Sequence, residues 1–229
     1  TGGSVSNIDG LIRTLGTANL CLINPNGIIF GPNASLKIGG SLFASTAESL
    51  NFADGIKFSA TAPQTTSLLS ISVPLGLQFG ASPASIQNQS QLQVEPGKSL
   101  ALVGGNVTLD GGLLQAANGR LELAGVAGSS TVGLNLNGND FSLSVPQDVA
   151  KADVSLTNGA KVDVANTGLG SVAVTARNID ISGGSRISAG IKESQPVGSP
   201  SRDVTLDATG VVRIIQDSQL NNVVESGAT

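Results

Sequence analysis

Few residues of this chain could carry out chemistry. Among its 229 residues are 16 acidic and 12 basic side chains, one cysteine and no histidine. The commonest general base and metal ligand is therefore missing. Cys21 has no partner for a disulfide within the chain. We interpret it as an inert strand residue, because a reactive thiol needs an accessible and perturbed environment. Carboxylates are the remaining candidates for catalysis.

Paired carboxylates would indicate cleavage of glycosidic bonds, which needs two acids about 5 to 10 Å apart. Asp153, Asp163 and Asp180 lie in alternating segments, where acids one structural repeat apart could meet. A β-helical enzyme that degrades polysaccharides is therefore one alternative. These acids form no Asp-x-Asp cluster, however, and scattered acids are usually solvated. We therefore expect no enzymatic activity.

The sequence also argues against metal, phosphate and nucleic-acid sites. Asp9 and Asp110 stand in "NIDG" and "TLDGG", which lack the acidic run of a calcium loop, so we interpret both as turn residues. No Lys-Ser/Thr pair follows "GNVTLDGG", as a phosphate loop requires. The net charge is −4 and the sequence shows no Lys/Arg stripe, so the electrostatic footprint of a nucleic-acid partner is missing. We expect no cofactor and no metal.

Two Pro-Asn pairs, Pro25-Asn26 and Pro32-Asn33, interrupt the apolar segment "LCLINPNGIIFGPNASLKIGG". Pro25 fixes its own φ and has no N–H to donate to a sheet ladder. Asn26 and Gly27 both tolerate positive φ, and Asn-Gly is a strong turn pair. Each Pro-Asn pair therefore predicts a corner between short strands. An architectural role explains both corners from residue chemistry alone.

The segments that would position these residues alternate apolar and polar side chains with a period of two. Examples are "SLALVGGNVTLDGG" and "SVAVTARNIDISGGSRISAG". The alternating segments recur with periods of roughly 20 to 25 residues, which is typical of a solenoid. Residues 154–164 resemble residues 179–189, and Ile8 in "SNIDGLI" maps onto Ile28 in "PNGIIFG".

These repeats predict an all-β fold, a right-handed parallel β-helix. Each strand has one apolar face, and stacked coils bury these faces in one continuous core. Because the chain has six Phe and no Trp or Tyr, aliphatic side chains must fill that core. We expect about nine or ten coils in a rod roughly 45 Å long. A β-sandwich is the alternative fold.

Three segments depart from the repeats. Residues 61–91 contain three prolines and predict an extra-helical hairpin or lobe packed on the rod. Residues 188–203 are rich in Pro, Gly and Ser and predict a loop. Residues 43–55 are the best candidate for a helical turn. We divide the chain into residues 1–137 and residues 138–229, with the second part continuing the repeats of the first.

Four motifs carry a family resemblance: "SNIDGLI", "NLCLINPNGIIFGPNA", "VPLGLQFG" and "ALVGGNVTLDGG". The stretch from residue 1 to about 127 that contains them closely resembles the haemagglutination-activity, or two-partner secretion, domain of filamentous-haemagglutinin-like exoproteins. It is most similar to the large cyanobacterial members. "NPNGI" is highly specific in combination with the other motifs. Residues 171–190 resemble, more loosely, the repeats that follow this domain in the same proteins.

The resemblance implies export by two-partner secretion. A signal peptide takes such proteins across the inner membrane. An outer-membrane β-barrel transporter with periplasmic POTRA domains then recognises the domain and threads the chain outward. The family's Asn-Pro-Asn motif is associated with secretion competence, and this role carries onto Asn24, Pro25, Asn26, Gly27 and Ile28. Contact with the transporter and a requirement for folding both stay open as explanations.

The resemblance also implies a β-helical protein that is secreted or held at the cell surface, and in many cases an adhesin. A host-cell or carbohydrate receptor is then a second expected partner, and a passive passenger rod is the alternative. The chain has no Met and opens in mid-pattern, so we expect an internal piece of a longer protein. The family domain normally begins earlier, with a cap and first coils that are missing here. We therefore expect the first coil to expose an open β edge.

Overall fold

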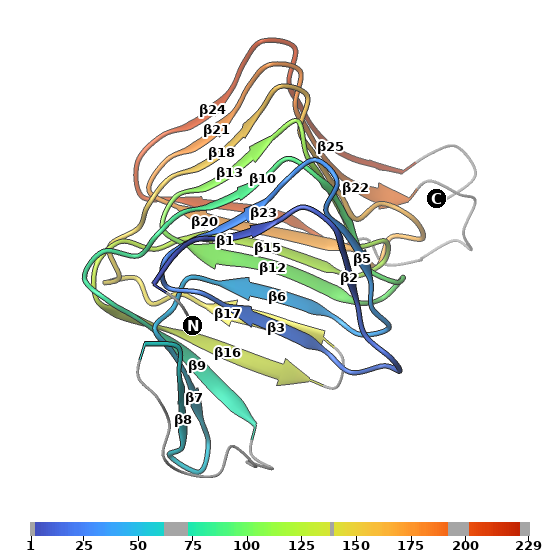
Figure 1. Cartoon of the computed structure of the whole chain (residues 1–229). Coiled ribbons are helices and arrows are strands. Elements are labelled where there is room, and N and C mark those ends of the chain that lie inside the picture. The colour runs from blue at the N-terminus through green and yellow to red at the C-terminus, as the bar shows by residue number, and fades with distance from the viewer. Residues whose placement is uncertain (1–2, 62–72, 138–139, 192–201, 225–229) are drawn as a thin grey trace.

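The computed structural model describes residues 3–61, 73–137, 140–191 and 202–224. Within these residues all the regular secondary structure consists of β-strands. None of these residues forms a helix long and apolar enough to cross a membrane. Most strands are parallel and wind in coils around one axis (Figure 1). The predicted all-β parallel β-helix is therefore confirmed. Residues 43–55, the candidate for a helical turn, instead contribute to two strands.

The first face of the β-helix is a seven-stranded parallel sheet with one strand from each coil. The described chain therefore makes seven coils, fewer than the nine or ten expected, because excursions outside the coils use up much of its length. At ~4.8 Å per coil the seven strands span roughly 30 Å. The strands of this face are β1 (Ser6–Ile8), β4 (Ile28–Phe30), β10 (Ile86–Asn88), β13 (Val107–Asp110), β18 (Val154–Thr157), β21 (Ile179–Ile181) and β24 (Val212–Ile214).

The other two faces follow in the same order within each coil. The second face comprises the paired strands β2 and β5 and a five-stranded sheet, and the third face is a six-stranded sheet. The second-face strands are β2 (Leu11–Arg13), β5 (Ser35–Lys37), β11 (Gln91–Gln93), β14 (Leu113–Gln115), β19 (Lys161–Asp163), β22 (Arg186–Ile191) and β25 (Gln219–Val224). The third-face strands are β3 (Leu20–Ile23), β6 (Leu42–Ser45), β12 (Ser99–Gly104), β15 (Arg120–Gly125), β20 (Ser171–Ala176) and β23 (Val204–Ala208).

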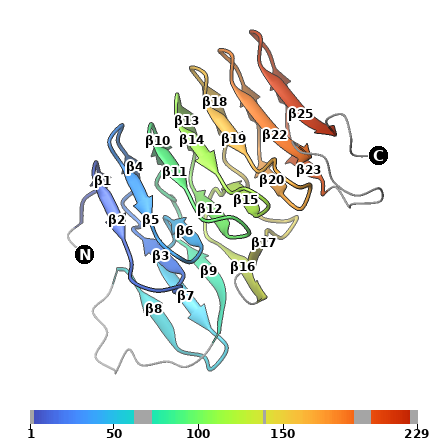
Figure 2. The ribbon, with the colours of Figure 1, turned by 90° about the vertical axis from the view of Figure 1, so that its right-hand side faces the viewer.

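The coils are right-handed. The N-terminal coil faces the viewer in Figure 1, and the side view of Figure 2 shows the later coils stacked behind it. From β1 through β2 to β3 the chain turns clockwise as it recedes from the viewer. The predicted hand of the β-helix is therefore confirmed.

The register of the strands confirms one predicted repeat and corrects another. Val154 pairs with Ile179, in agreement with the likeness between residues 154–164 and 179–189. Ile8, however, pairs with Phe30 and not with Ile28, which lies opposite Ser6. A shift of two positions keeps every side chain on the same face of a strand, so the apolar pattern alone cannot distinguish the two registers.

One core runs through the interior of the first six coils. It consists almost wholly of aliphatic side chains from the three faces, as the composition predicted. Residues at the inward positions of neighbouring coils stack on one another, and Ile28, Ile86 and Val107 are each completely buried. The alternation of apolar and polar residues is therefore the pattern of a half-buried strand repeated coil after coil.

An antiparallel five-stranded sheet forms a lobe on the outside of the third face (Figure 1). Its strands are β7 (Ser49–Phe52), β8 (Lys57–Ser59), β9 (Pro74–Phe79), β16 (Ser130–Asn137) and β17 (Asp140–Ser144). The lobe is needed because β12 is apolar on both sides: Leu100 and Leu102 point into the coil, while Ala101 and Val103 point outward into a second core beneath the lobe.

The predicted lobe exists, but its boundaries differ from those expected. It contains residues 49–59 and 74–79 together with the distant antiparallel strands β16 and β17. Residues 86–91, which the prediction assigned to the lobe, instead form strand β10 and the start of strand β11 in the third coil. Residues 62–72 lie outside the described part of the chain, as does most of the predicted loop, residues 192–201. The division after residue 137 stays a prediction.

Candidate functional site

The corner Asn24-Pro25-Asn26-Gly27 joins the third face of the first coil to the first face of the second. It is a β-turn closed by a hydrogen bond from the Gly27 amide to the Asn24 carbonyl, 3.1 Å long. Pro25 takes the second position of the turn, where its fixed φ is favourable. Gly27 alone of the pair Asn26-Gly27 has positive φ, +113°. The prediction of a corner at this motif is therefore confirmed, although Asn26 needs no left-handed backbone.

Asn24 is the hydrogen-bonding centre of this corner. Its side-chain Nδ2 donates to the Ser4 carbonyl at 3.0 Å and to Ser6 Oγ at 2.7 Å. Its Oδ1 accepts from the backbone N of Asn26 at 3.0 Å and from Asn26 Nδ2 at 3.3 Å. Both donors and the acceptor of the Asn24 amide are thus used within the protein. The side chain ties the corner to the chain that enters the first coil.

Gly27 and Ile28 are both buried, and the packing around them determines the size of each side chain. A Cβ on Gly27 would lie 3.3 Å from the Ser85 carbonyl oxygen and 3.5 Å from Val5 Cγ2, so a side chain would press on the third coil. Ile28 is completely buried and pairs with Ser6 on one side and Ile86 on the other. Asn26 is the one exposed residue of the five. The motif therefore has one outward side chain, while the others serve the packing of the first three coils.

The second Pro-Asn corner is closed from the previous coil by Asp9. The Asp9 carboxylate accepts hydrogen bonds from the backbone N of Asn33 at 2.8 Å and from Asn33 Nδ2 at 2.9 Å. These two bonds hold the pKa of Asp9 below its ordinary value. A Cβ on Gly31 would lie 2.6 Å from Asp9 Oδ1, which explains the glycine before Pro32. The prediction of Asp9 as a turn residue therefore missed its main contact.

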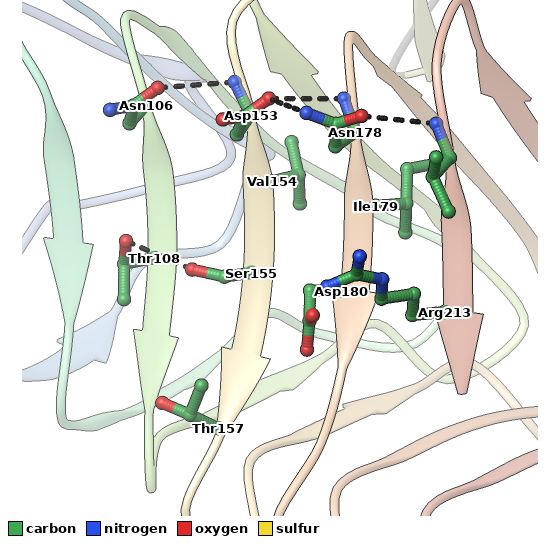
Figure 3. A pocket seen from close by; sticks show the side chains of 11 residues that line it. Asn106, Thr108, Asp153, Val154, Ser155, Thr157, Asn178, Ile179, Asp180 and Arg213 are labelled. Atoms are coloured by element: carbon green, nitrogen blue, oxygen red, sulfur yellow. Dashed lines mark hydrogen bonds between the residues drawn. The ribbon is translucent and has the colours of Figure 1, made fainter. Parts of the chain in front are cut away.

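The corner occupied by Gly27 in the second coil carries longer polar side chains in the later coils. Asn106 Oδ1 accepts from the backbone N of Asp153 at 3.1 Å, and Asp153 Oδ1 accepts from the backbone N of Asn178 at 3.1 Å. Asn178 Oδ1 in turn accepts from the backbone N of Val211 at 3.0 Å. Figure 3 shows these side chains in a row across the strand starts. They form a ladder with one side chain per coil.

A groove of about 610 Å³ lies beside this ladder, on the outside of the first face. Its lining includes Asp153 and Asp180, two of the three carboxylates considered for catalysis, whereas Asp163 lies on the second face. Arg177 donates two hydrogen bonds to Asp153 and lowers the pKa of its carboxyl group. A glycosidase needs one carboxylic acid with a raised pKa. Asp153 therefore lacks the property of the proton donor, which weakens the enzymatic alternative.

Metal binding also lacks a supporting constellation. Among the described residues, no group of three or more His, Cys, Asp or Glu side chains could hold a metal ion. Asp110, the other acid in a candidate calcium loop, ends β13 and accepts from Asn158 Nδ2 at 2.6 Å and Gln89 Nε2 at 3.1 Å. These bonds lower the pKa of Asp110, with Asn158 as the largest cause. Asp110 thus links three successive coils through its side chain.

The sequence contained a signal for the side-chain hydrogen bonds between coils, which the prediction missed. Asp9 precedes Asn33, and Asp153 precedes Asn178, by a separation close to one coil in each case. An Asp or Asn that recurs at the repeat length next to the start or the end of a strand predicts a bond between coils. The contacts of Asn24 follow no such recurrence, because its side chain reaches back to Ser4 and Ser6 at the start of the first coil. Only the correct register between the coils would have predicted them.

The fold and the corner together define a parallel β-helix. The family model described as the TPS secretion domain matches residues 1–174. The chain therefore belongs to the two-partner secretion domain family, and the resemblance of its motifs to that domain is confirmed. The similarity to cyanobacterial members stays a prediction. Such a domain is part of a secreted exoprotein that crosses the outer membrane with the help of a partner transporter. No curated protein matches the chain.

Proposed function

We propose that this chain directs export of its parent protein through a cognate outer-membrane transporter with POTRA domains, and that the Asn24–Ile28 motif acts in export through folding of the first coils. Membership of the TPS secretion domain family supports the export role. The observation that carries the second part is the saturation of the Asn24 amide, whose donors bond Ser4 and Ser6 and whose acceptor bonds Asn26. A transporter would have to break these bonds to use the same groups.

The proposal gives the residues of the motif different roles. Asn24 ties the corner, Pro25 and Gly27 shape the turn, and Ile28 fills the core. Asn26 is exposed and makes one weak side-chain bond of 3.3 Å to Asn24. Export should therefore depend strongly on Asn24, Gly27 and Ile28 and little on the side chain of Asn26.

An export assay in cells that carry the parent protein tests this function. The amount of parent in the medium is measured with the transporter present and after deletion of its gene. We expect export to require the transporter and to fall severalfold for Asn24→Leu, while Asn26→Ala is exported normally. Export of the parent at an unchanged level without any transporter would refute the proposed route.

For the parent protein as a whole we propose a role as a cell-surface adhesin that contacts a host-cell or carbohydrate receptor. The support is the family's secreted location together with a long β-helical surface rich in Ser, Thr and Asn. A passive passenger rod is the alternative. If the intact parent is exported normally but neither agglutinates cells nor adheres to them, the adhesin role is refuted and the passive rod is favoured.

A further inference from the structure

The second face of the β-helix places like charges directly opposite one another. Arg13 on β2 pairs in register with Lys37 on β5, and Lys161 on β19 pairs with Arg186 on β22. All four side chains are exposed. Like charges opposite each other on neighbouring strands lower stability. Folding therefore gains nothing from this arrangement, which occurs twice on the same face.

These four cations have no acidic partners within the described part of the chain. The three ion pairs found there join Arg120 with Glu122, Lys151 with Asp207 and Arg177 with Asp153, on other faces. One acid, Asp163, stands at an outward strand position of the second face, and its Oδ1 accepts a bond from the Ala165 amide. The face is therefore locally cationic on a protein whose net charge is −4.

The spacing of the two cation pairs indicates a long ligand. The first pair lies in coils one and two, and the second pair lies in coils five and six. Arg13 in coil one and Arg186 in coil six are therefore separated by five coil spacings, or roughly 24 Å along the axis. Three cavities among the described residues lie on the first face, the third face and the corner between them, so none of these three is on the second face. A small anion would need a concave pocket. An extended polyanion would instead lie along the axis, across the second-face strands that Figure 2 shows side by side.

The residues between the two cation pairs indicate the chemistry of that polymer. Gln91, Gln93 and Gln115 occupy outward positions of β11 and β14, between the charged coils. Amide side chains both donate and accept hydrogen bonds, which suits hydroxyl groups. The outward positions of these strands carry no aromatic side chain on which nucleic-acid bases could stack.

From these observations we propose that the second face binds an extended polysaccharide that bears carboxylate or sulfate groups. Arg13, Lys37, Lys161 and Arg186 contact its charges, and the glutamines between them contact its hydroxyl groups. The proposal deepens the adhesin role by naming a class of receptor. The predicted absence of a cationic stripe holds for the linear sequence but not for this face, because the four residues are distant in sequence and meet only through the register of the coils.

Binding of the purified chain to immobilised dextran sulfate, with neutral dextran as reference, tests the proposal without any export step. The variants are Arg13→Gln/Lys37→Gln, Lys161→Gln/Arg186→Gln and the combination of all four. We expect each double variant to raise Kd roughly three- to tenfold, as loss of two exposed charge contacts should, and the quadruple variant to lose binding. Removal of the like-charge pairs should leave the thermal midpoint unchanged or raised, which rules out misfolding as the cause.

The matched control is Lys57→Gln/Arg213→Gln, which changes the net charge equally with exposed residues of β8 and β24. We expect less than a twofold change in Kd for this control. An equal loss in control and test variants would overturn the proposal, since net charge alone would then explain binding. Equal binding to neutral dextran, or tighter binding to duplex DNA or to anionic lipid vesicles than to dextran sulfate, would overturn it as well.

Discussion

The same corner of the β-helix is built in two different ways at its two ends. Before the first-face strand in coils four to six stand Asn106, Asp153 and Asn178, and each side chain bonds the backbone of the next coil. At the equivalent position of the second coil stands Gly27, and the bond between coils comes from Asn24, earlier in the same turn.

The backbone ladder at this corner is nevertheless continuous from one end to the other. Ser6 N donates to the Gly27 carbonyl at 3.0 Å, just as Val154 N donates to the Asn178 carbonyl at 3.0 Å. Both ends of the corner therefore keep the backbone bonds. The side-chain bonds differ, because three residues share them in the later coils, whereas a single side chain makes four of them at the first corner. Loss of a single residue should cost more at the N-terminal corner than in the ladder.

The largest effect is expected at Gly27. Gly27→Ala should lower the free energy of unfolding by roughly 2–4 kcal/mol, because positive φ strains an alanine and the new Cβ presses on Ser85. Urea unfolding followed by circular dichroism measures this, since the chain has no Trp or Tyr to report by fluorescence. The control is Gly159→Ala, at φ +74° with open space around it, which should cost roughly 1 kcal/mol. Equal costs would show that crowding at Gly27 is unimportant.

A smaller effect is expected for Asn24→Leu, which preserves the shape of the side chain and removes its hydrogen bonds. The free energy of unfolding should fall by roughly 2–3 kcal/mol, given four lost bonds at a partly exposed position. Asn24→Asp keeps the acceptor and loses the donors to Ser4 and Ser6. Its free energy of unfolding should therefore lie between those of Asn24→Leu and the wild type. A cost under about 0.5 kcal/mol for Asn24→Leu would contradict the central role of this amide.

In the ladder, Asn178→Ala should cost only about 1 kcal/mol, because the Asn178 side chain makes two hydrogen bonds, half as many as that of Asn24. The variant loses the acceptor for Val211 N and the donor to Asp153 but keeps the bond from its own backbone N to Asp153. The same urea titration measures this loss. If Asn178→Ala destabilised the protein as much as Asn24→Leu, the contrast between the two ends of the corner would be wrong.

The smallest effect is a dependence of stability on acid pH at Asp153. Its pKa in the folded protein is lowered, mainly by Arg177, so its stabilising contribution is complete above the unfolded pKa of about 3.9. That contribution is lost as the pH falls through the lower folded value. Asp153→Asn should therefore flatten the fall in thermal midpoint between roughly pH 5 and pH 2. An identical acid dependence in variant and wild type would show that the Arg177 contact adds no stability.

The repeats, the handedness and the apolar core could be predicted because they depend on a period of two and on a family resemblance. The lobe could be predicted only in part. Its second half, β16 and β17, lies far along the chain from β9, and antiparallel pairing of such distant segments leaves no local signal. Outward apolar residues such as Val103 were the available clue that the third face needed a cover.

The corner at Asn24–Ile28 could be located from sequence, but not the partners of its side chains. Pro25 and Gly27 indicate a turn through their own backbone preferences, which are local. The contacts of Asn24 with Ser4 and of Asp9 with Asn33 depend instead on the register between coils, and the predicted register was shifted by two positions at that point. The paired cations of the second face stayed hidden because they too meet only through that register.

The most direct test of the account compares export with stability across the corner variants. Parent proteins that carry Gly27→Ala, Asn24→Leu, Asn178→Ala or Asn26→Ala are expressed with the cognate transporter. The exported fraction of each is compared with the free energy of unfolding of the matching purified chain. The account predicts that export falls in the order of lost stability and that Asn26→Ala is exported like the wild type. Blocked export of Asn26→Ala at wild-type stability would contradict it, because the motif would then be read by direct contact.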